Sequence, residues 1–233
     1  MGPMSVAMNL QRVQQAIASA AGAAGRAPQS IKLLAVSKTF GPEAVIAAAD
    51  AGQLAFGENY VQEAIDKIAA VRAMRPDLTL EWHFIGPLQS NKTRLIAEHF
   101  DWVHAIDREK IAQRLSDQRP ASLAPLNSCV QVNVSGEASK SGVAPDALAP
   151  LAQAVAGMPR LRLRGLMAIP EAAEEWHHQR QPFAFLRALQ QQLQAAGLDT
   201  DTLSMGMSAD MAAAIMEGAT IVRIGTAIFG KRD

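Results

Sequence analysis

The chain has 233 residues, of which 49% are hydrophobic and 19% charged, and its 22 Lys and Arg residues equal its 22 Asp and Glu residues. A formal net charge of zero creates no long-range field that would attract nucleic acid or an anionic membrane surface. No apolar run approaches the roughly 20 residues of a membrane-spanning helix. The composition therefore predicts a soluble protein with small-molecule partners, without nucleic acid or a membrane as a partner.

Cys129 is the single cysteine of the sequence, so it has no intrachain disulfide partner and belongs to no cysteine-based metal site. Its place in the apolar run SCVQVNV favours a small buried side chain over a nucleophile. The five histidines show no HExxH or similar ligand spacing, so we expect no metal. This cysteine usage is typical of a reducing compartment and predicts a cytoplasmic protein.

The N-terminal residues 5–23 predict an extra helix that lies against the rest of the protein. Residues 1–42 contain no Asp or Glu but do contain Arg12, Arg26, Lys32 and Lys38, so a transit peptide is the alternative. The stretch continues without a break into the first expected strand, which favours the helix.

Short strand-like runs then alternate with helical patterns. The expected strands are 32–38, 54–58, 81–86, 101–106, 128–134, 161–169, 202–207 and 220–229. The expected helices between them are 42–51, 60–74, 91–99, 108–118, 145–156, 176–196 and 209–217. Pro42, Pro145 and Pro182 open or precede helices, and glycines follow helix ends, in agreement with these boundaries. The alternation is typical of βαβ units around a parallel sheet.

Eight strands with connecting helices in a chain of 233 residues predict a single (β/α)8 TIM barrel, one domain over residues 1–233, with the extra helix in front. An open doubly wound sheet is the alternative. Its nucleotide-binding form is disfavoured because no GxGxxG or GxxxxGK[ST] motif follows an early strand.

Lys38 is the first candidate for chemistry, because functional side chains of a barrel gather at the carboxyl ends of the strands. It ends the run KLLAVSK, and alternation with Leu34 and Val36 would place its ammonium at the barrel mouth. Desolvation there would lower the pKa of the amine and allow it to condense with an aldehyde. A solvated lysine at a strand end is the alternative.

Arg223 stands alone in the otherwise apolar last strand, TIVRIGTAIF. A buried guanidinium needs acceptors, which could be a carboxylate elsewhere or a pyridine nitrogen. Because arginine keeps its proton, a pyridine nitrogen facing it would stay largely unprotonated, and the ring would be a weak electron sink. Arg223 therefore favours holding a pyridine cofactor over carbanion chemistry.

The loops after the last two strands are the usual phosphate site of a barrel. Ser208 follows SMGM and precedes an expected helix, so it would cap that helix while backbone N–H groups face an anion. Gly225 and Thr226 would add close backbone approach and a hydroxyl donor. Together these residues predict a phosphate cup, although capping alone would also explain Ser208.

Seven tracts, in order, resemble the family of pyridoxal 5'-phosphate (PLP) homeostasis proteins: LLAVSKT, FGENYVQE, EWHFIGPLQSNK, EASKSG, RGLMAIP, SMGMSADM and VRIGTAIFG. The resemblance covers the chain from about residue 8 to the end. This family is in turn similar to the N-terminal barrel of alanine racemase, a fold type III PLP protein, so the resemblance implies PLP as the cofactor.

The resemblance also implies a role for particular residues. Lys38 would form the Schiff base, Arg223 would face the pyridine nitrogen, and Asn59 would lie beside the cofactor. The phosphate would be held by Ser208, Gly225 and Thr226.

Five further residues lie in matching tracts without an implied role. Packing and helix capping would explain the tract residues His83, Gln89, Asn91 and Lys92. Lys140 is either a lid residue or a solvated loop charge.

The function that the resemblance implies is PLP carriage and homeostasis without turnover, with PLP-dependent apoenzymes as possible recipients and a monomer as the expected state. Racemases add a second, mostly β domain with a tyrosine acid/base, which this chain is expected to lack. A small racemase-like enzyme that uses Lys38 and Tyr60 is the catalytic alternative. A barrel that binds another phosphorylated metabolite is the third.

Overall fold

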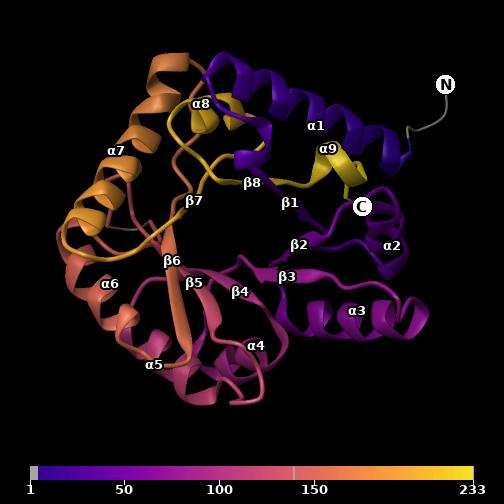
Figure 1. The fold of residues 1–233 in the computed structure, drawn as a ribbon, viewed down its shortest axis with the longest axis horizontal. Coiled ribbons are helices and arrows are strands. Elements are labelled where there is room, and N and C mark those ends of the chain that lie inside the picture. The colour runs from indigo at the N-terminus through magenta and orange to yellow at the C-terminus, as the bar shows by residue number, and fades with distance from the viewer. Residues whose placement is uncertain (1–4, 139, 233) are drawn as a thin grey trace.

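The computed structural model describes residues 5–138 and 140–232, and its eight strands form a closed parallel barrel ringed by helices (Figure 1). Each strand pairs with the next, and β8 pairs with β1 through Leu34 and Arg223. The predicted barrel is therefore confirmed, and the open sheet is wrong. The strands are β1 Lys32–Val36, β2 Ala55–Glu58, β3 Glu81–Phe84, β4 Trp102–Ile106, β5 Leu126–Gln131, β6 Leu161–Met167, β7 Thr202–Ser204 and β8 Ile221–Ile224.

Helices cover the outside of the barrel. The α-helices are α1 Val6–Ala23, α2 Pro42–Asp50, α3 Val61–Met74, α4 Thr93–His99, α5 Glu109–Gln118, α6 Leu148–Ala156, α7 Trp176–Ala195, α8 Met211–Met216 and α9 Thr226–Phe229. Three short 3-10 helices, Pro28–Ser30, Ser90–Lys92 and Pro145–Ala147, precede β1, α4 and α6. None of the described helices is both long and apolar enough to cross a membrane.

The predicted N-terminal helix is α1. It starts where the Ser5 hydroxyl accepts a hydrogen bond from the Met8 N–H, and it buries Leu10, Val13 and Ile17. Figure 1 shows α1 running alongside α8 and α9, so it covers the part of the barrel where the chain ends. Burial of its apolar stripe is what holds this helix to the barrel.

The core lies in the barrel and between the strands and their covering helices. Helix α3 shows the principle, because Ala64, Ile68 and Val71 recur three and four residues apart and are all buried. Cys129 on β5 is also fully buried, which raises the pKa of its thiol to about 12 and agrees with a packing role.

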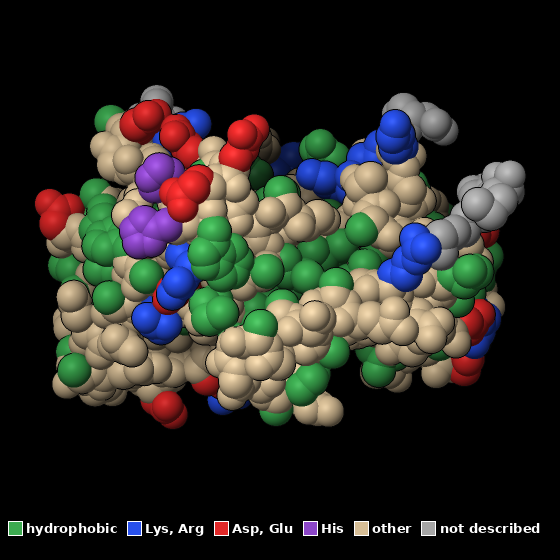
Figure 2. All heavy atoms as spheres, turned by 90° about the horizontal axis from the view of Figure 1, so that it is seen from above, with side chains coloured by type: hydrophobic (Ala, Val, Ile, Leu, Met, Phe, Trp, Pro, Cys, Tyr) green, Lys and Arg blue, Asp and Glu red, His purple; other side chains and the backbone are tan. Residues whose placement is uncertain are grey.

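On the face in Figure 2, side chains of both charge signs appear, with apolar ones between them.

Three sequence expectations about boundaries are wrong. The run 220–229 is not one strand, because β8 ends at Ile224 and a short helix, α9, starts at Thr226. Strand β7 likewise ends at Ser204, well before residue 207. Pro182 lies inside α7 and does not open it, so the helix forgoes one backbone hydrogen bond there. The buried residues Phe183, Leu186 and Leu189 compensate, since tertiary packing outweighs local propensity.

Candidate functional site

A pocket of about 440 Å3 opens at the carboxyl ends of the strands. All six predicted cofactor residues line it: Lys38, Asn59, Ser208, Arg223, Gly225 and Thr226. The other lining residues are Val36, Ile85, Ile169, Met207, Ala209 and Arg232. Residues from the first strand and from the last loop of the barrel therefore line the same pocket.

Lys38 lies two residues beyond the end of β1 and is partly buried. Burial, and then the positive charge of Arg232, lower the pKa of its amine. The next residue, Thr39, has a φ of 69°, in the left-handed region that a β-branched residue rarely adopts. A lower pKa increases the fraction of unprotonated amine, the form that attacks an aldehyde.

A cluster of charged side chains, with Glu58 and Lys67 buried and Glu63 partly exposed, holds the backbone on both sides of Lys38. The Lys67 ammonium lies 2.8 Å from a Glu58 oxygen and donates to the Ser37 carbonyl oxygen at 2.7 Å. The Ser37 hydroxyl donates to the other Glu58 oxygen, and the Thr39 N–H donates to Glu63 at 2.6 Å. These contacts fix the unusual backbone at Thr39. We name Glu58, Glu63 and Lys67 the clamp.

Arg223 is buried and makes all its described hydrogen bonds to neutral oxygens. Nη1 donates to the Ser204 carbonyl oxygen at 3.1 Å and to the Ser204 hydroxyl at 2.8 Å, and Nη2 donates to the Ala168 carbonyl oxygen at 3.1 Å. Among the described ion pairs none involves Arg223, which argues against the carboxylate partner considered from the sequence. Burial lowers its pKa to about 10, so the guanidinium remains charged at neutral pH.

Asn59 follows β2 and lines the same pocket. Its Oδ1 atom is buried and has no hydrogen-bond partner among the described residues. The position is tightly packed, because a Cβ atom on Gly86 would come within 2.7 Å of the Asn59 carbonyl oxygen. A buried acceptor without a donor is costly, so this atom is suited to a ligand that brings one.

The loops after β7 and β8 supply the remaining polar groups. The expectation that Ser208 caps a helix is wrong: Asp210 is at the N-cap of α8, and its carboxylate accepts from the Met207 N–H at 2.7 Å. Because of this turn, α8 begins only at Met211, and Ser208 lies in the wall of the pocket. Gly225 precedes α9, where an added Cβ would lie 3.0 Å from Arg232 Nη2.

Arg232 is a pocket residue that the sequence did not single out. Its Nε donates to the Lys38 carbonyl oxygen at 3.1 Å, and its guanidinium lies 5.3 Å from the centre of the Phe40 ring. With Lys38 and Arg223 it gives the pocket three basic side chains, a donor set suited to a phosphate-bearing ligand. The described residues contain no group of three or more His, Cys, Asp or Glu side chains placed to bind a metal ion.

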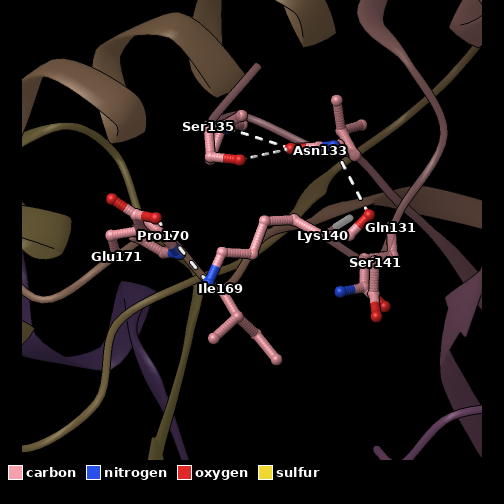
Figure 3. A pocket seen from close by; sticks show the side chains of 10 residues that line it. Gln131, Asn133, Ser135, Lys140, Ser141, Ile169, Pro170 and Glu171 are labelled. Atoms are coloured by element: carbon pink, nitrogen blue, oxygen red, sulfur yellow. Dashed lines mark hydrogen bonds and ion pairs between the residues drawn. The ribbon is translucent and has the colours of Figure 1, made fainter. Parts of the chain in front are cut away.

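A second hollow of about 250 Å3 adjoins the first through Ile169. Figure 3 shows Lys140 reaching across it toward Glu171, and the two charged groups lie 3.6 Å apart. Asn133 organises the loop on its other side by accepting from the N–H and the hydroxyl of Ser135. Lys140 is thus at the barrel mouth and half exposed, which is compatible with both roles considered for it.

The chain matches the family model of the alanine racemase N-terminal domain over residues 8–233. The pyridoxal phosphate homeostasis protein of Vibrio cholerae is 58% identical over 229 residues, 98% of this chain and 97% of the relative.

Two solved structures are informative. PipY of Synechococcus elongatus, whose structure has PLP bound, is 38% identical with a TM-score of 0.79 and covers 92% of this chain and 100% of its own. Alanine racemase from Corynebacterium glutamicum, 17% identical with a TM-score of 0.71, covers 97% of this chain but only 60% of its own and shares the fold.

Proposed function

Since the chain belongs to the pyridoxal phosphate homeostasis proteins, which share the alanine racemase N-terminal domain, we propose that its pocket binds PLP as a Schiff base on Lys38. The observation that carries the proposal is the convergence of Lys38, Arg223 and the Ser208 and Thr226 loops on one pocket. PLP supplies an aldehyde for an amine, a phosphate dianion and a pyridine nitrogen. The pocket offers an amine of lowered pKa, hydroxyl donors and a buried guanidinium for these groups.

In this assignment, Ser208, Gly225 and Thr226 hold the phosphate, and Arg232 adds positive charge beside them. Arg223 donates to the pyridine nitrogen. Asn59 lies beside the ring, where its unpaired Oδ1 would gain a donor. The pocket therefore offers a partner for the aldehyde, the phosphate and the pyridine nitrogen of the cofactor.

We propose that the protein carries PLP for homeostasis and does not turn over a substrate. Arg223 remains protonated at neutral pH, so it keeps the pyridine nitrogen it faces in the unprotonated form, a weak electron sink. Racemisation also needs a proton-transfer group opposite the lysine. Tyr60, the candidate for that role, is 54% exposed and is not among the residues that line the pocket.

Titration of the purified protein with PLP, followed by visible absorbance, tests the binding site. We expect a lysine-bound PLP band in the wild type and in Lys110→Ala, which alters an exposed lysine on α5. The band is expected to disappear in Lys38→Ala. Borohydride reduction followed by mass spectrometry should place the adduct on Lys38. An unchanged band in Lys38→Ala would refute this assignment.

Solvent-deuterium exchange at Cα of a panel of amino acids tests the lack of turnover. We expect no exchange above the rate of free PLP, whereas exchange at ordinary enzymatic rates would establish the racemase-like alternative. We further propose a cytoplasmic monomer that delivers PLP to PLP-dependent apoenzymes. Sedimentation and transfer of PLP to an apoenzyme are the corresponding measurements.

A further inference from the structure

A series of buried polar side chains runs through the barrel interior from Arg223 to the opposite, amino-terminal end. Ser204 on β7, His104 on β4 and His83 on β3 are each fully buried. The Ser204 hydroxyl lies 2.8 Å from Arg223 Nη1 and 2.7 Å from His104 Nδ1, and His104 Nε2 lies 2.8 Å from His83 Nδ1. None of these three residues lines the pocket.

The series ends at Glu81, the first residue of β3. His83 Nε2 lies 2.6 Å from a Glu81 carboxylate oxygen, and Lys32, the first residue of β1, reaches the same oxygen at 2.6 Å. The hydrogen bond from His83, followed by that from Lys32, lowers the pKa of Glu81 to about 2. The carboxylate is therefore ionised at neutral pH and can only accept hydrogen bonds.

An acceptor at this end determines the tautomer of both histidines. Burial lowers the pKa of His83 and of His104, so each ring is neutral and has one N–H. His83 must donate from Nε2 to Glu81, which leaves its Nδ1 as an acceptor. His104 must then donate from Nε2 to that atom, and its own Nδ1 becomes the acceptor for Ser204.

The other end of the series requires the same direction. The guanidinium of Arg223 only donates, so the Ser204 oxygen accepts from Nη1 and its hydroxyl hydrogen is free to reach His104. Every hydrogen bond thus points from Arg223 toward Glu81. A reversed tautomer on either ring would set two N–H groups against each other or leave a buried hydrogen without an acceptor.

We propose that Ser204, His104 and His83 are positioning residues that orient Arg223 through a one-directional hydrogen-bond series anchored on Glu81. Three bonds, to Ser204 and Ala168, hold one side of the guanidinium. Its Nε–H and the second hydrogen of Nη2 make no described hydrogen bond and remain for a ligand in the pocket. The effect on cofactor binding rests on the proposed PLP site, whereas the series itself does not.

Histidine-selective 15N labelling and long-range 1H–15N NMR spectra of the cofactor-free protein test the series without reference to PLP. We expect both His83 and His104 as neutral Nε2–H tautomers at pH 7. A protonated ring, or an Nδ1–H tautomer at either position, would overturn the proposal. This measurement uses the wild type and depends on no variant that must fold.

PLP titration of three serine variants tests the positioning of Arg223. Ser204→Ala removes the hydroxyl between Arg223 and His104, and we expect about tenfold or greater loss of PLP affinity. The conservative Ser204→Thr should restore most of it. Ser128→Ala is the matched control, because Ser128 is also fully buried on a strand but donates only to the Leu126 carbonyl oxygen.

The outcomes separate the two proposals. If the wild type does not bind PLP, the proposed function fails, and the tautomers still decide whether the series exists. If the wild type binds PLP and Ser204→Ala matches Ser128→Ala in affinity, the positioning role is refuted. The His104 Nδ1 resonance should also shift in Ser204→Ala and stay in place in Ser128→Ala, and an unmoved resonance would contradict the Ser204 contact.

Discussion

Lys67 donates a hydrogen bond of 2.7 Å to the carbonyl oxygen of Ser37, the residue immediately before Lys38. The same ammonium pairs with Glu58, and both side chains are almost completely buried. Such a pair adds little net stability, because desolvation opposes the attraction between the charges. Its position indicates another role, which is to fix the peptide next to Lys38, the lysine that we propose binds PLP.

We therefore predict that Glu58→Gln weakens PLP binding although Glu58 is not among the residues that line the pocket. The variant leaves the Lys67 ammonium buried with a weaker partner, and we expect a loss of about 3 kcal/mol of unfolding free energy. The backbone at Ser37 and Thr39 should then become less ordered. Urea denaturation and PLP titration measure the two effects.

The control for this variant is Glu217→Gln. Glu217 is likewise a buried carboxylate with basic partners, Arg180 and Arg187, but it lies outside the pocket. A smaller loss of stability with unchanged PLP affinity is expected, because Arg180 and Arg187 are partly exposed and remain solvated without Glu217. Equal effects of both variants on PLP affinity would show that the clamp acts only through general stability.

A second prediction concerns the pKa of Lys38. The charge of Arg232 is one of the two causes that lower this pKa, so Arg232→Gln should raise it. Less free amine is then present near neutral pH, and condensation with PLP should be slower. The pH at which the condensation rate reaches half of its maximum should increase. A weaker attraction for the phosphate would lower the rate without moving this midpoint. Arg12→Gln, on α1, is the control and should leave the profile unchanged.

The sequence pattern predicts the strand number, the barrel and five of the residues that line the pocket, because each depends on local pattern or on the position of a residue at a strand end. Arg223 is an example, since burial of a lone charged side chain in an apolar strand is costly unless it binds acceptors. Asn59, a sixth lining residue, is implied only by the family resemblance. Ser208, Gly225 and Thr226 do line the pocket, although β8 is shorter than the pattern predicts and Asp210, not Ser208, is at the N-cap of α8.

The contacts behind the pocket could not be found in this way. His104 and Ser204 are 100 positions apart, and their hydrogen bond exists only because the barrel brings β4 and β7 to one interior. Lys67 is buried, although nothing in the pattern of the expected helix 60–74 distinguishes it from a solvated polar residue. Strand register determines which of these side chains meet, and the sequence pattern leaves the register open.

A third prediction follows from the two buried histidines. Their pKa values in the folded protein lie below the value of 6.5 for a free histidine, so the unfolded chain binds more protons as the pH falls below that value. The unfolding free energy should therefore decrease with falling pH below about 6.5, by up to about 1.4 kcal/mol per pH unit for each histidine. Urea denaturation between pH 7 and pH 5 measures the slope.

The exposed His178 provides the control for this slope. His178→Gln should leave the dependence on pH unchanged, because this side chain is 66% exposed and folding does not remove it from water. A wild-type unfolding free energy that is flat over this range would mean that His83 and His104 accept protons in the folded state.

The last prediction contrasts two glycines. Gly206 lies between β7 and Ser208 with a φ of 103°, and a Cβ atom there would come within 2.6 Å of the Ala214 Cβ atom. Gly206→Ala should lower the unfolding free energy by about 1–3 kcal/mol and displace the loop after β7, which we propose holds the phosphate, with weaker PLP binding. Gly22, in the last turn of α1, has no atom within 4 Å of an added Cβ. Gly22→Ala should raise the unfolding free energy by about 0.5–1 kcal/mol and leave PLP binding unchanged, because alanine is the better helix former. Equal PLP affinity in the two variants would contradict a phosphate site in the loop after β7.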